Sequence, residues 1–396
     1  MAAGGGVTKS AEVVVVGAGV MGLWTAFMLR ERGHDVILVD AWGPGHLRAT
    51  SSDESRVIRC GYGGAGFYTR WAQRSLALWA KWQKRWKEEL LFPCGVLWLV
   101  TGDPIYAEAS LTELERNRIS FERLDRRSLE RRYPQIDPRG VRWSLFEPES
   151  GTILARRACL VVARAFEKAG GSIALAEVRP GPASGRRLTE VVATGVRGTA
   201  SRRIAAKKFV FACGPWLPGI FPELLRGRIR VTRKELFYFG TPPGDDRFGT
   251  SRCPVWLELG TQCYGIPSIE GRGFKVGPDV PGRVVDPTTQ DRRPSRKLLG
   301  LARACLKRRF PAMADAPVLE SRVCQYESTR DENLIFDRHP RFDNVWIVGG
   351  GSGHAFKHGP VIGELVADVV GSPGAGSIAA VPPHLRLSHV PSGSHF

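Results

Sequence analysis

The sequence predicts an α/β protein in which a discontinuous dinucleotide-binding domain carries an inserted, mainly antiparallel β-sheet domain. Three observations support this fold class. A β-branched run near the N-terminus leads into a glycine-rich turn and a helix. Strand-like segments in the middle of the chain follow one another without alternating helices. Near the C-terminus a buried strand, a glycine-rich turn and a helix return.

The first element of this fold is a β-α-β unit that spans Val13–Asp40. Val13–Val16 predicts a strand buried on both faces, and the helical pattern after it extends to about Arg32. Gly33 suits the end of that helix, and Val36–Val39 predicts a second strand.

The turn between the first strand and the helix carries the three-glycine fingerprint of a Rossmann-like dinucleotide site. Its residues are Gly17, Ala18, Gly19, Val20, Met21 and Gly22. The glycines permit a tight turn and a close approach to a pyrophosphate, and the helix N-terminus faces the phosphate charge. Asp40, at the end of the second strand, would accept hydrogen bonds from a ribose hydroxyl. The unit therefore predicts dinucleotide binding.

The later elements divide between the two predicted domains. An amphipathic helix over Tyr68–Leu90 carries a stripe of tryptophans that predicts packing against the core. The strands expected in the inserted layer are Cys94–Val100, Glu235–Gly240, Val255–Glu258 and Gln262–Ile266. The buried-strand pattern returns at Lys208–Ala212 and Val345–Val348, and a final helix is expected over Gly359–Val370.

These elements predict a nucleotide-binding domain built from residues 1–90, 150–217 and 320–370. The substrate domain would comprise residues 91–149 and 218–319. Residues 371–396 are rich in proline, glycine and serine, which predicts a flexible tail.

Composition excludes several classes of protein. With 43% hydrophobic and 24% charged residues, the 396-residue chain can bury a core, so disorder throughout is excluded. We see no apolar run of about 18 residues that would span a membrane, and Met1–Ser10 lacks the pattern of a secretory signal. The eight cysteines form no C-x-x-C pair, so neither a metal site nor a disulfide framework is expected. A reducing, cytoplasmic location follows as the expectation.

The chain is strongly basic, with 57 Lys and Arg against 39 Asp and Glu, a net charge of +18. Such a balance is typical of proteins with acidic or nucleic-acid partners, or simply of an Arg-rich surface. The arginines are scattered, and aromatic residues do not interleave with them as on a base-stacking surface. A nucleic-acid partner is therefore not expected.

Three further segments distinguish between nucleotide cofactors. The first runs from Thr50 to Gly63 and the second from Gly271 to Gly277. The third begins with Cys324-Gln325-Tyr326, continues through Asp337-Arg338-His339-Pro340 and ends with Ser352-Gly353-His354-Ala355-Phe356-Lys357. Together they resemble the FAD-dependent amine oxidases of the D-amino-acid oxidase superfamily, in particular the monomeric sarcosine, N-methyltryptophan and pipecolate oxidase group. The resemblance covers about residues 13–370.

The resemblance implies an FAD-binding domain and oxidation of a C–N bond in a secondary amine or an N-substituted or cyclic amino acid. In such enzymes a hydride equivalent passes from the carbon beside nitrogen to the flavin, and the imine is hydrolysed. Oxygen then reoxidises the flavin and yields hydrogen peroxide. The implied partners are a small amine or amino acid and O₂, and the implied state is a monomer or weak oligomer.

The resemblance also implies roles for individual residues. Cys324 matches the position of the covalent bond to the flavin. Arg59 and Lys357 match the cations that bind a substrate carboxylate, a role that suits the planar fork of arginine. Lys275 matches the lysine that activates oxygen. The other positions taken for the catalytic site are Tyr326 and Asp279, and those taken for FAD are Ser55, Arg56, Val178, Gly214, Gly351, Gly353, His354 and Lys357, in addition to the fingerprint.

Some positions depart from the pattern of this group. Ser51-Ser52-Asp53 stands where sarcosine-type enzymes carry a histidine pair, and Cys60 and Asp279 replace further histidines. These departures count against sarcosine itself, with a larger N-substituted or cyclic amino acid as an equal alternative. Three other functions stay open: a dehydrogenase with a non-oxygen acceptor, a flavin domain acting on modified transfer-RNA bases, and a non-catalytic flavoprotein subunit.

Overall fold

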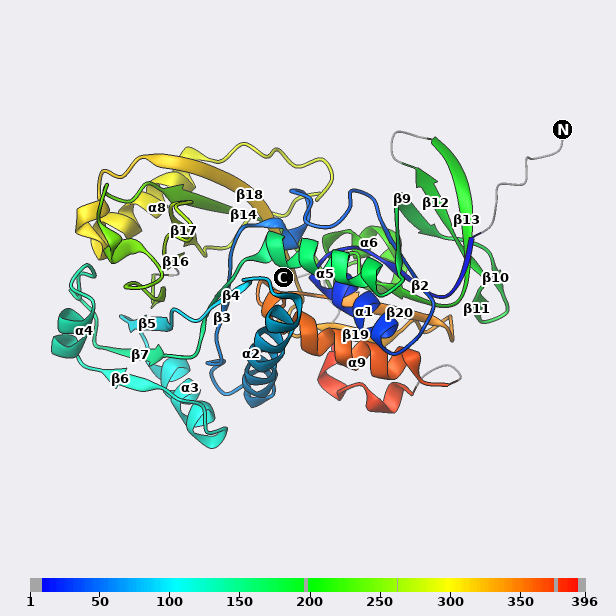
Figure 1. Cartoon of the computed structure of the whole chain (residues 1–396), viewed down its shortest axis with the longest axis horizontal. Helices are drawn as coiled ribbons and strands as arrows, with labels where there is room; N and C mark the ends of the chain where they lie inside the picture. The colour runs from blue at the N-terminus through cyan, green and yellow to red at the C-terminus, as the bar shows by residue number, and fades with distance from the viewer. Residues whose placement is uncertain (1–8, 196–198, 262, 374–376, 391–396) are drawn as a thin grey trace.

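Two large β-sheets organise the computed structural model, which describes residues 9–195, 199–261, 263–373 and 377–390 (Figure 1). In the view of Figure 1 the seven-stranded sheet lies on the right with helices α1 and α9, and the eight-stranded sheet lies on the left with helix α8. This arrangement confirms the predicted α/β class with a separate sheet domain.

The seven-stranded sheet is built around the predicted β-α-β unit. Strand β1 (Lys9–Val16) pairs in parallel with β2 (Val36–Asp40) on one side and β13 (Thr199–Phe211) on the other. Helix α1 (Val20–Glu31) joins β1 to β2. The valines of β1 are buried because both faces of the sheet are covered, which explains their uninterrupted run.

The remaining strands of this sheet extend it at both edges. Parallel strand β20 (Val345–Gly349) lies beside β13, and β19 (Ile335–Arg338) runs antiparallel at the edge. On the far side β9 (Ser172–Pro180) pairs with β2, and β12 (Glu190–Gly195) pairs antiparallel with β9 and with the first half of β13. The helices of this domain include α5 (Ala155–Lys168) and α9 (Gly359–Gly371), both of which contact α1.

The eight-stranded sheet is antiparallel at every step except one. Its order is β18 (Val318–Ser328), β14 (Arg230–Phe239), β17 (Phe274–Pro278), β16 (Cys263–Ile266), β15 (Val255–Leu259), β5 (Val96–Val100), β7 (Trp143–Glu147) and β6 (Glu122–Leu124). The pair β15–β5 is parallel. Helix α8 (Arg296–Arg309) covers this sheet, and Phe237, Phe274 and Trp256 are buried in the core with Phe310.

Shorter elements connect the two sheets. A three-stranded sheet consists of β3 (Arg56–Ile58), β8 (Gly151–Ile153) and β4 (Leu91–Phe92). The other helices are α2 (Gly66–Trp86), α3 (Ile105–Arg116), α4 (Arg126–Arg132), α6 (Leu217–Ile220) and α7 (Pro222–Leu225), and a two-stranded ribbon pairs β10 (Ala183–Ser184) with β11 (Arg187–Leu188). Within the described ranges no helix combines the length and apolar character that a membrane crossing requires.

Two expectations from the sequence differ from the structure. The domain boundary expected at residue 320 falls inside β18, which pairs with β14 along its length. The predicted flexible tail is contradicted over residues 377–390, because Val381 and Leu385 are buried against the core. Apolar side chains spaced among the prolines drive this packing. Residues 374–376 and 391–396 of the predicted tail, and Gln262 at the start of a predicted strand, lie outside the described residues.

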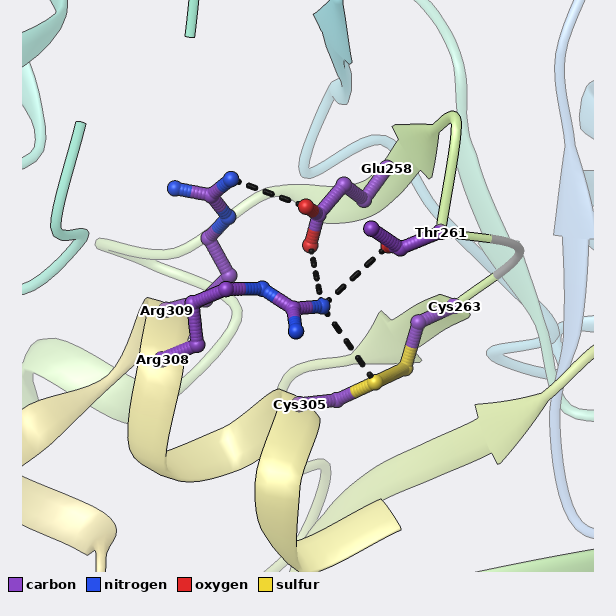
Figure 2. Close-up of a disulfide and its surroundings, with 6 residues drawn as sticks. All are labelled: Glu258, Thr261, Cys263, Cys305, Arg308 and Arg309. Atoms are coloured by element: carbon purple, nitrogen blue, oxygen red, sulfur yellow. Dashed lines mark hydrogen bonds and ion pairs between the residues drawn. A yellow bond between two sulfur atoms is a disulfide. The ribbon is translucent and has the colours of Figure 1, made fainter. Parts of the chain in front are cut away.

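The structure also contains a disulfide that the cysteine spacing did not indicate. Cys263 of β16 is bonded to Cys305 of α8, 42 residues later in the chain (Figure 2). Beside it Glu258 accepts from Arg309, at 2.8 Å, and from Arg308, at 3.0 Å. The bond fastens α8 onto the eight-stranded sheet, a long-range contact that local sequence pattern does not show.

Candidate active site

The fingerprint turn forms one wall of the site. Gly17 has a φ of +105°, and a Cβ there would overlap the carbonyl oxygen of Ala212 at the end of β13. A Cβ on Gly22 would overlap the carbonyl oxygen of Gly17, so the first turn of the helix can pack this closely on the glycine turn only with glycine at position 22. One carboxylate oxygen of Asp40 accepts from the backbone N–H of Ala18 at 2.7 Å, which holds the end of β2 against the turn.

The opposite wall comes from the loops that follow β13 and β20. Gly214 has a φ of +53°, and its Cα faces the buried carboxyl group of Glu327. Gly351 donates its N–H to Oε1 of Glu327 at 3.3 Å. Val178, also expected at the cofactor, is a buried residue of β9, beyond the last pairing of that strand with β2.

A buried charge cluster surrounds Lys275, on β17. Its Nζ contacts the carboxylate of Asp53 and donates to the carbonyl oxygen of Ser55 at 2.8 Å. Asp53 also pairs with Arg56 and accepts from the Tyr238 hydroxyl at 2.7 Å. Lys275 and Asp53 are only 1% and 2% exposed, so this ion pair is shielded from solvent and from salt.

The electrostatics of this cluster follow from its burial. Burial alone would raise the pKa of Asp53, but the positive charges of Lys275 and Arg56 hold that pKa below its usual range. Burial lowers the pKa of Lys275 to about 8, against the attraction of Asp53. The lysine can therefore gain or lose its proton near neutral pH, as a residue with a role in proton or charge transfer requires.

Cys324 lies beside this cluster on β18. Its thiol is buried, and the Sγ is 3.9 Å from a terminal nitrogen of Arg56. Tyr326, two residues along the same strand, faces Nζ of Lys234 at 4.7 Å and contacts Gly353.

The half-buried Arg59 and the buried Lys357 form a second group. Nζ of Lys357 is 2.8 Å from the Tyr62 hydroxyl, and Arg59 lies over the ring of the same tyrosine, 4.6 Å from its centre. Across the part of the chain that the structure describes, neither cation has a carboxylate within ion-pair distance. Glu147 lies near Arg59, but its oxygens accept from the N–H groups of Cys60 and Gly61 and from other donors.

The charge of Arg59 acts on Lys357. Burial lowers the pKa of Lys357 well below its ordinary value, and the positive charge of Arg59 lowers it further. Burial also lowers the pKa of His354 to about 3, so this histidine is neutral. A buried ammonium group beside a second cation is unfavourable without an anion, and an anionic ligand between Lys357 and Arg59 would favour its charged form.

Asp279 does not join either cluster. Its side chain is 47% exposed and pairs with Lys234 at 2.9 Å. Asp279, taken from the resemblance as a catalytic-site position, therefore points outwards in the structure. The physical reason is the position of Asp279 just after the end of β17, where the chain returns to the surface.

A cavity of about 160 Å³ reaches Lys275 from the outside. Its lining includes Tyr238 and Ser55 from the charge cluster together with Arg157 and Arg272. The cavity therefore borders the charge cluster, although Lys275 itself is only 1% exposed.

Sequence reasoning missed several residues of these clusters. Asp53 was noted only as a departure, although a carboxylate three residues before Arg56 was a signal for an ion pair. Tyr62 belongs to the same segment as Arg59 and could have been noted there. Tyr238 and Glu327 carry no local signal, because β14 and β18 bring them to the site from distant parts of the chain.

Comparison with known proteins identifies the family. A family model described as FAD dependent oxidoreductase matches residues 12–369. The chain belongs to this family. It is 29% identical over 373 residues to the peroxisomal sarcosine oxidase of Homo sapiens, covering 90% of this chain and 91% of that protein.

Two further comparisons support this assignment. This FAD-dependent oxidoreductase is 27% identical to the N-methyl-L-tryptophan oxidase of Salmonella newport, over 90% of this chain and 94% of that protein. Among solved structures, the L-proline dehydrogenase from P. horikoshii shares the fold with a TM-score of 0.79 and 18% identity, over 92% of this chain and 94% of that one.

The residues present fit FAD. The walls at Gly17, Gly214 and Gly351 leave no room for side chains where a pyrophosphate and a ribityl chain would approach the backbone. One oxygen of the buried Glu327 carboxyl lacks a hydrogen-bond partner and points to the same place. The N-terminus of α1 adds a site for phosphate charge.

Proposed function

We propose that this enzyme oxidises the C–N bond of a secondary amine or of an N-substituted or cyclic amino acid. FAD is the oxidant, oxygen is reduced to hydrogen peroxide, and the imine product is hydrolysed. The observation that carries the proposal is the pair of cations formed by the half-buried Arg59 and the buried Lys357, which have no carboxylate within ion-pair distance among the residues the structure describes. A substrate carboxylate supplies the missing anion.

The comparisons support this substrate class. The relatives at 27–29% identity are named for sarcosine and for N-methyl-L-tryptophan. Both molecules combine a carboxylate with a methylated nitrogen. A site that holds the carboxylate by two cations would orient the carbon beside nitrogen in one fixed direction.

FAD, when bound, supplies the two-electron oxidant, and the side chains supply binding and charge. Tyr62 holds the ammonium group of Lys357 in place by a 2.8 Å hydrogen bond. A bound carboxylate favours the charged form of Lys357, against the effect of burial on its pKa. Lys275 offers a cation near which negative charge on reduced oxygen is stabilised. Cys324 would hold the flavin covalently.

The test mixes the purified flavoprotein with each candidate substrate in the absence of oxygen. Loss of the yellow absorbance band of oxidised flavin measures the reduction. The panel contains sarcosine, proline, pipecolate, N-methyl aromatic amino acids, glycated amino acids and simple amines. We expect carboxylated secondary amines to bleach the flavin and their methyl esters to do so much more weakly. Bleaching by simple amines alone would contradict the proposal.

A variant of Arg59 tests whether this cation binds the substrate carboxylate, separately from the chemistry of the flavin. Arg59→Ala should raise KM for the acid substrate by roughly 30- to 1,000-fold, as the loss of a buried charge partner does, and should leave the KM for the ester unchanged. An unchanged KM for the acid would refute the role of Arg59.

Admission of air to the bleached enzyme distinguishes an oxidase from a dehydrogenase. An oxidase regains its yellow colour at once, whereas a dehydrogenase regains it slowly.

A further inference from the structure

A buried carboxyl group stands at the wall of the cofactor site and takes no part in the function proposed above. Glu327 is the residue after Tyr326 on β18 and is 5% exposed. Its Oε1 accepts the N–H of Gly351 at 3.3 Å, whereas its Oε2 has no hydrogen-bond partner. An acidic group left half-satisfied in the interior is costly and calls for a ligand.

The position of this carboxyl is fixed from two sides by glycine. A Cβ on Gly214 would lie 3.1 Å from Oε2, and a Cβ on Gly351 would lie 3.0 Å from Oε1. The same Cβ on Gly351 would lie 3.6 Å from the side chain of Met21, in the first turn of α1. Glu327 therefore borders the fingerprint helix, the loop after β13 and the loop after β20, which together form the predicted FAD cradle.

We propose that Glu327 is a neutral carboxylic acid that donates a hydrogen bond from Oε2 to an oxygen atom of bound FAD. Since the cradle brings backbone close to the pyrophosphate and the ribityl chain, the acceptor is an oxygen of one of these two groups. The proposal rests on FAD binding by this family member and adds a recognition residue to it.

The surroundings favour the neutral form. Burial raises the pKa of Glu327 to about 8, and the N–H of Gly351 offsets this only in part. The titratable group facing it from the β13 side is the thiol of Cys213, whose own pKa is raised by burial, by Asp40 and by Glu327 itself. Met21 on α1 carries no charge. A phosphate nearby would raise the pKa of the acid further.

The experiment measures FAD affinity rather than turnover. The protein carries Cys324→Ser so that binding is reversible, and FAD is titrated into the apoprotein by calorimetry. We expect Glu327→Gln, which keeps a neutral donor, to bind FAD within about threefold of its parent at pH 7. Glu327→Leu should weaken binding by about 10- to 100-fold, as the loss of a hydrogen bond to an oxygen that carries charge does.

The pH dependence provides the decisive comparison. Above about pH 8 the parent should lose affinity about tenfold per pH unit as Glu327 ionises, and Glu327→Gln should lack this loss. Glu320→Gln, on the exposed part of the same strand, is the matched control and should behave as the parent. Titration with ADP, which contains the pyrophosphate but no ribityl chain, identifies the acceptor oxygen. If Glu327→Leu weakens ADP binding, the acceptor lies on the pyrophosphate. If ADP binding is unchanged, the acceptor lies on the ribityl chain.

Two results would overturn the proposal. One is equal FAD affinity in the parent and in Glu327→Leu. The other is an FAD affinity of Glu327→Gln as low as that of Glu327→Leu. If Glu327→Leu does not fold, the pH comparison between the parent and Glu327→Gln still decides. Failure of the parent to bind FAD at all would instead contradict the cofactor assignment.

Discussion

At the scale of single residues, the buried carboxylate of Asp53 connects the groups that surround the expected flavin. It pairs with Lys275 and Arg56 and accepts from Tyr238. Without it, two cations would share a buried space with no anion. Asp53 is therefore a positioning residue that keeps Lys275 both in place and charged.

The first prediction concerns the replacement of this carboxylate by an amide. Because the charge of Asp53 raises the pKa of Lys275 against burial, Asp53→Asn should lower that pKa below its value of about 8. Lys275 is charged below its pKa and neutral above it, so oxygen reactivity should be lost at a lower pH than in the wild type. Stopped-flow reoxidation of the reduced enzyme at several pH values measures the midpoint.

The matched control for this prediction is Glu54→Gln, next to Asp53 in sequence. Glu54 pairs with Arg322 and Arg272 rather than with Lys275. We expect Glu54→Gln to lose oxygen reactivity at the same midpoint pH as the wild type. If Asp53→Asn also loses it at the wild-type pH, the ion pair does not act on Lys275.

The second prediction concerns the thiol beside Arg56. If Cys324 is bonded to FAD, acid precipitation should leave the yellow colour in the pellet, and Cys324→Ser should release all of it into the supernatant. Cys253→Ser, at a buried cysteine in the core of the eight-stranded sheet, should retain colour in the pellet. Colour in the supernatant of the wild type would refute the covalent bond.

At the scale of secondary-structure elements, the disulfide joins β16 to α8 across 42 residues of chain. Closing a loop of that size in the unfolded state stabilises the folded state by about 4 kcal/mol on the chain-entropy estimate. The third prediction is that Cys305→Ser lowers the free energy of unfolding by about this amount. Urea denaturation measures it.

A reducing agent provides the control for the disulfide. Dithiothreitol should lower the urea midpoint of the wild type and leave that of Cys305→Ser unchanged. Equal midpoints for the oxidised wild type and the variant would contradict a stabilising bond.

The fourth prediction tests the helix that begins at the fingerprint turn. A Cβ on Gly22 overlaps the carbonyl oxygen of Gly17, so Gly22→Ala should cost about 1–3 kcal/mol of stability and weaken FAD binding. Gly300, inside α8, has nothing within 4 Å of its added Cβ. Gly300→Ala should therefore stabilise the protein by about 0.4–1 kcal/mol. Unchanged stability in Gly22→Ala would show that the turn has room.

The elements that sequence alone predicted are those whose signals are local. The valine run, the glycines and Asp40 lie within one unit, and the structure places β1, α1 and β2 there with ends shifted by a few residues. The strand expected at Glu235–Gly240 begins five residues earlier in β14, because these largely polar residues also pair with β18.

The parts that sequence could not predict depend on pairing between distant segments. The parallel pair β15–β5 joins residues about 160 positions apart. The contacts of Asp53 with Lys275 and Tyr238 likewise depend on the register of β17 and β14. Resemblance to a family suggested roles for Lys275 and Cys324. It could not do so for a residue that departs from the family pattern, such as Asp53, whose contacts only the structure shows.

At the scale of the whole molecule, the expected FAD contacts come from segments spread along the chain. They lie in the fingerprint, in residues 55–56, in the loops after β13 and β20, and on β18. The fifth prediction is that FAD stabilises the molecule as a unit. In the Cys324→Ser background, FAD at a hundredfold excess over its Kd should add about 2.7 kcal/mol to the free energy of unfolding.

Fluorescence and circular dichroism, followed through urea denaturation, check this prediction. Both midpoints should rise together on addition of FAD. A rise in only one of them would show that the two sheets unfold independently. Riboflavin in place of FAD serves as the control for nonspecific stabilisation.

Strand β18 belongs to the edge of the eight-stranded sheet and, in its last residues, to the cofactor cradle. The backbone N–H of Ser352 donates to the carbonyl oxygen of Glu327 at 2.9 Å, and Glu327 is one of ten residues of β18 that pair with β14. The last residues of β18 therefore bond at once to the eight-stranded sheet and to the loop after β20. A rigid rotation of that sheet away from the cradle would have to break the bond between Ser352 and Glu327.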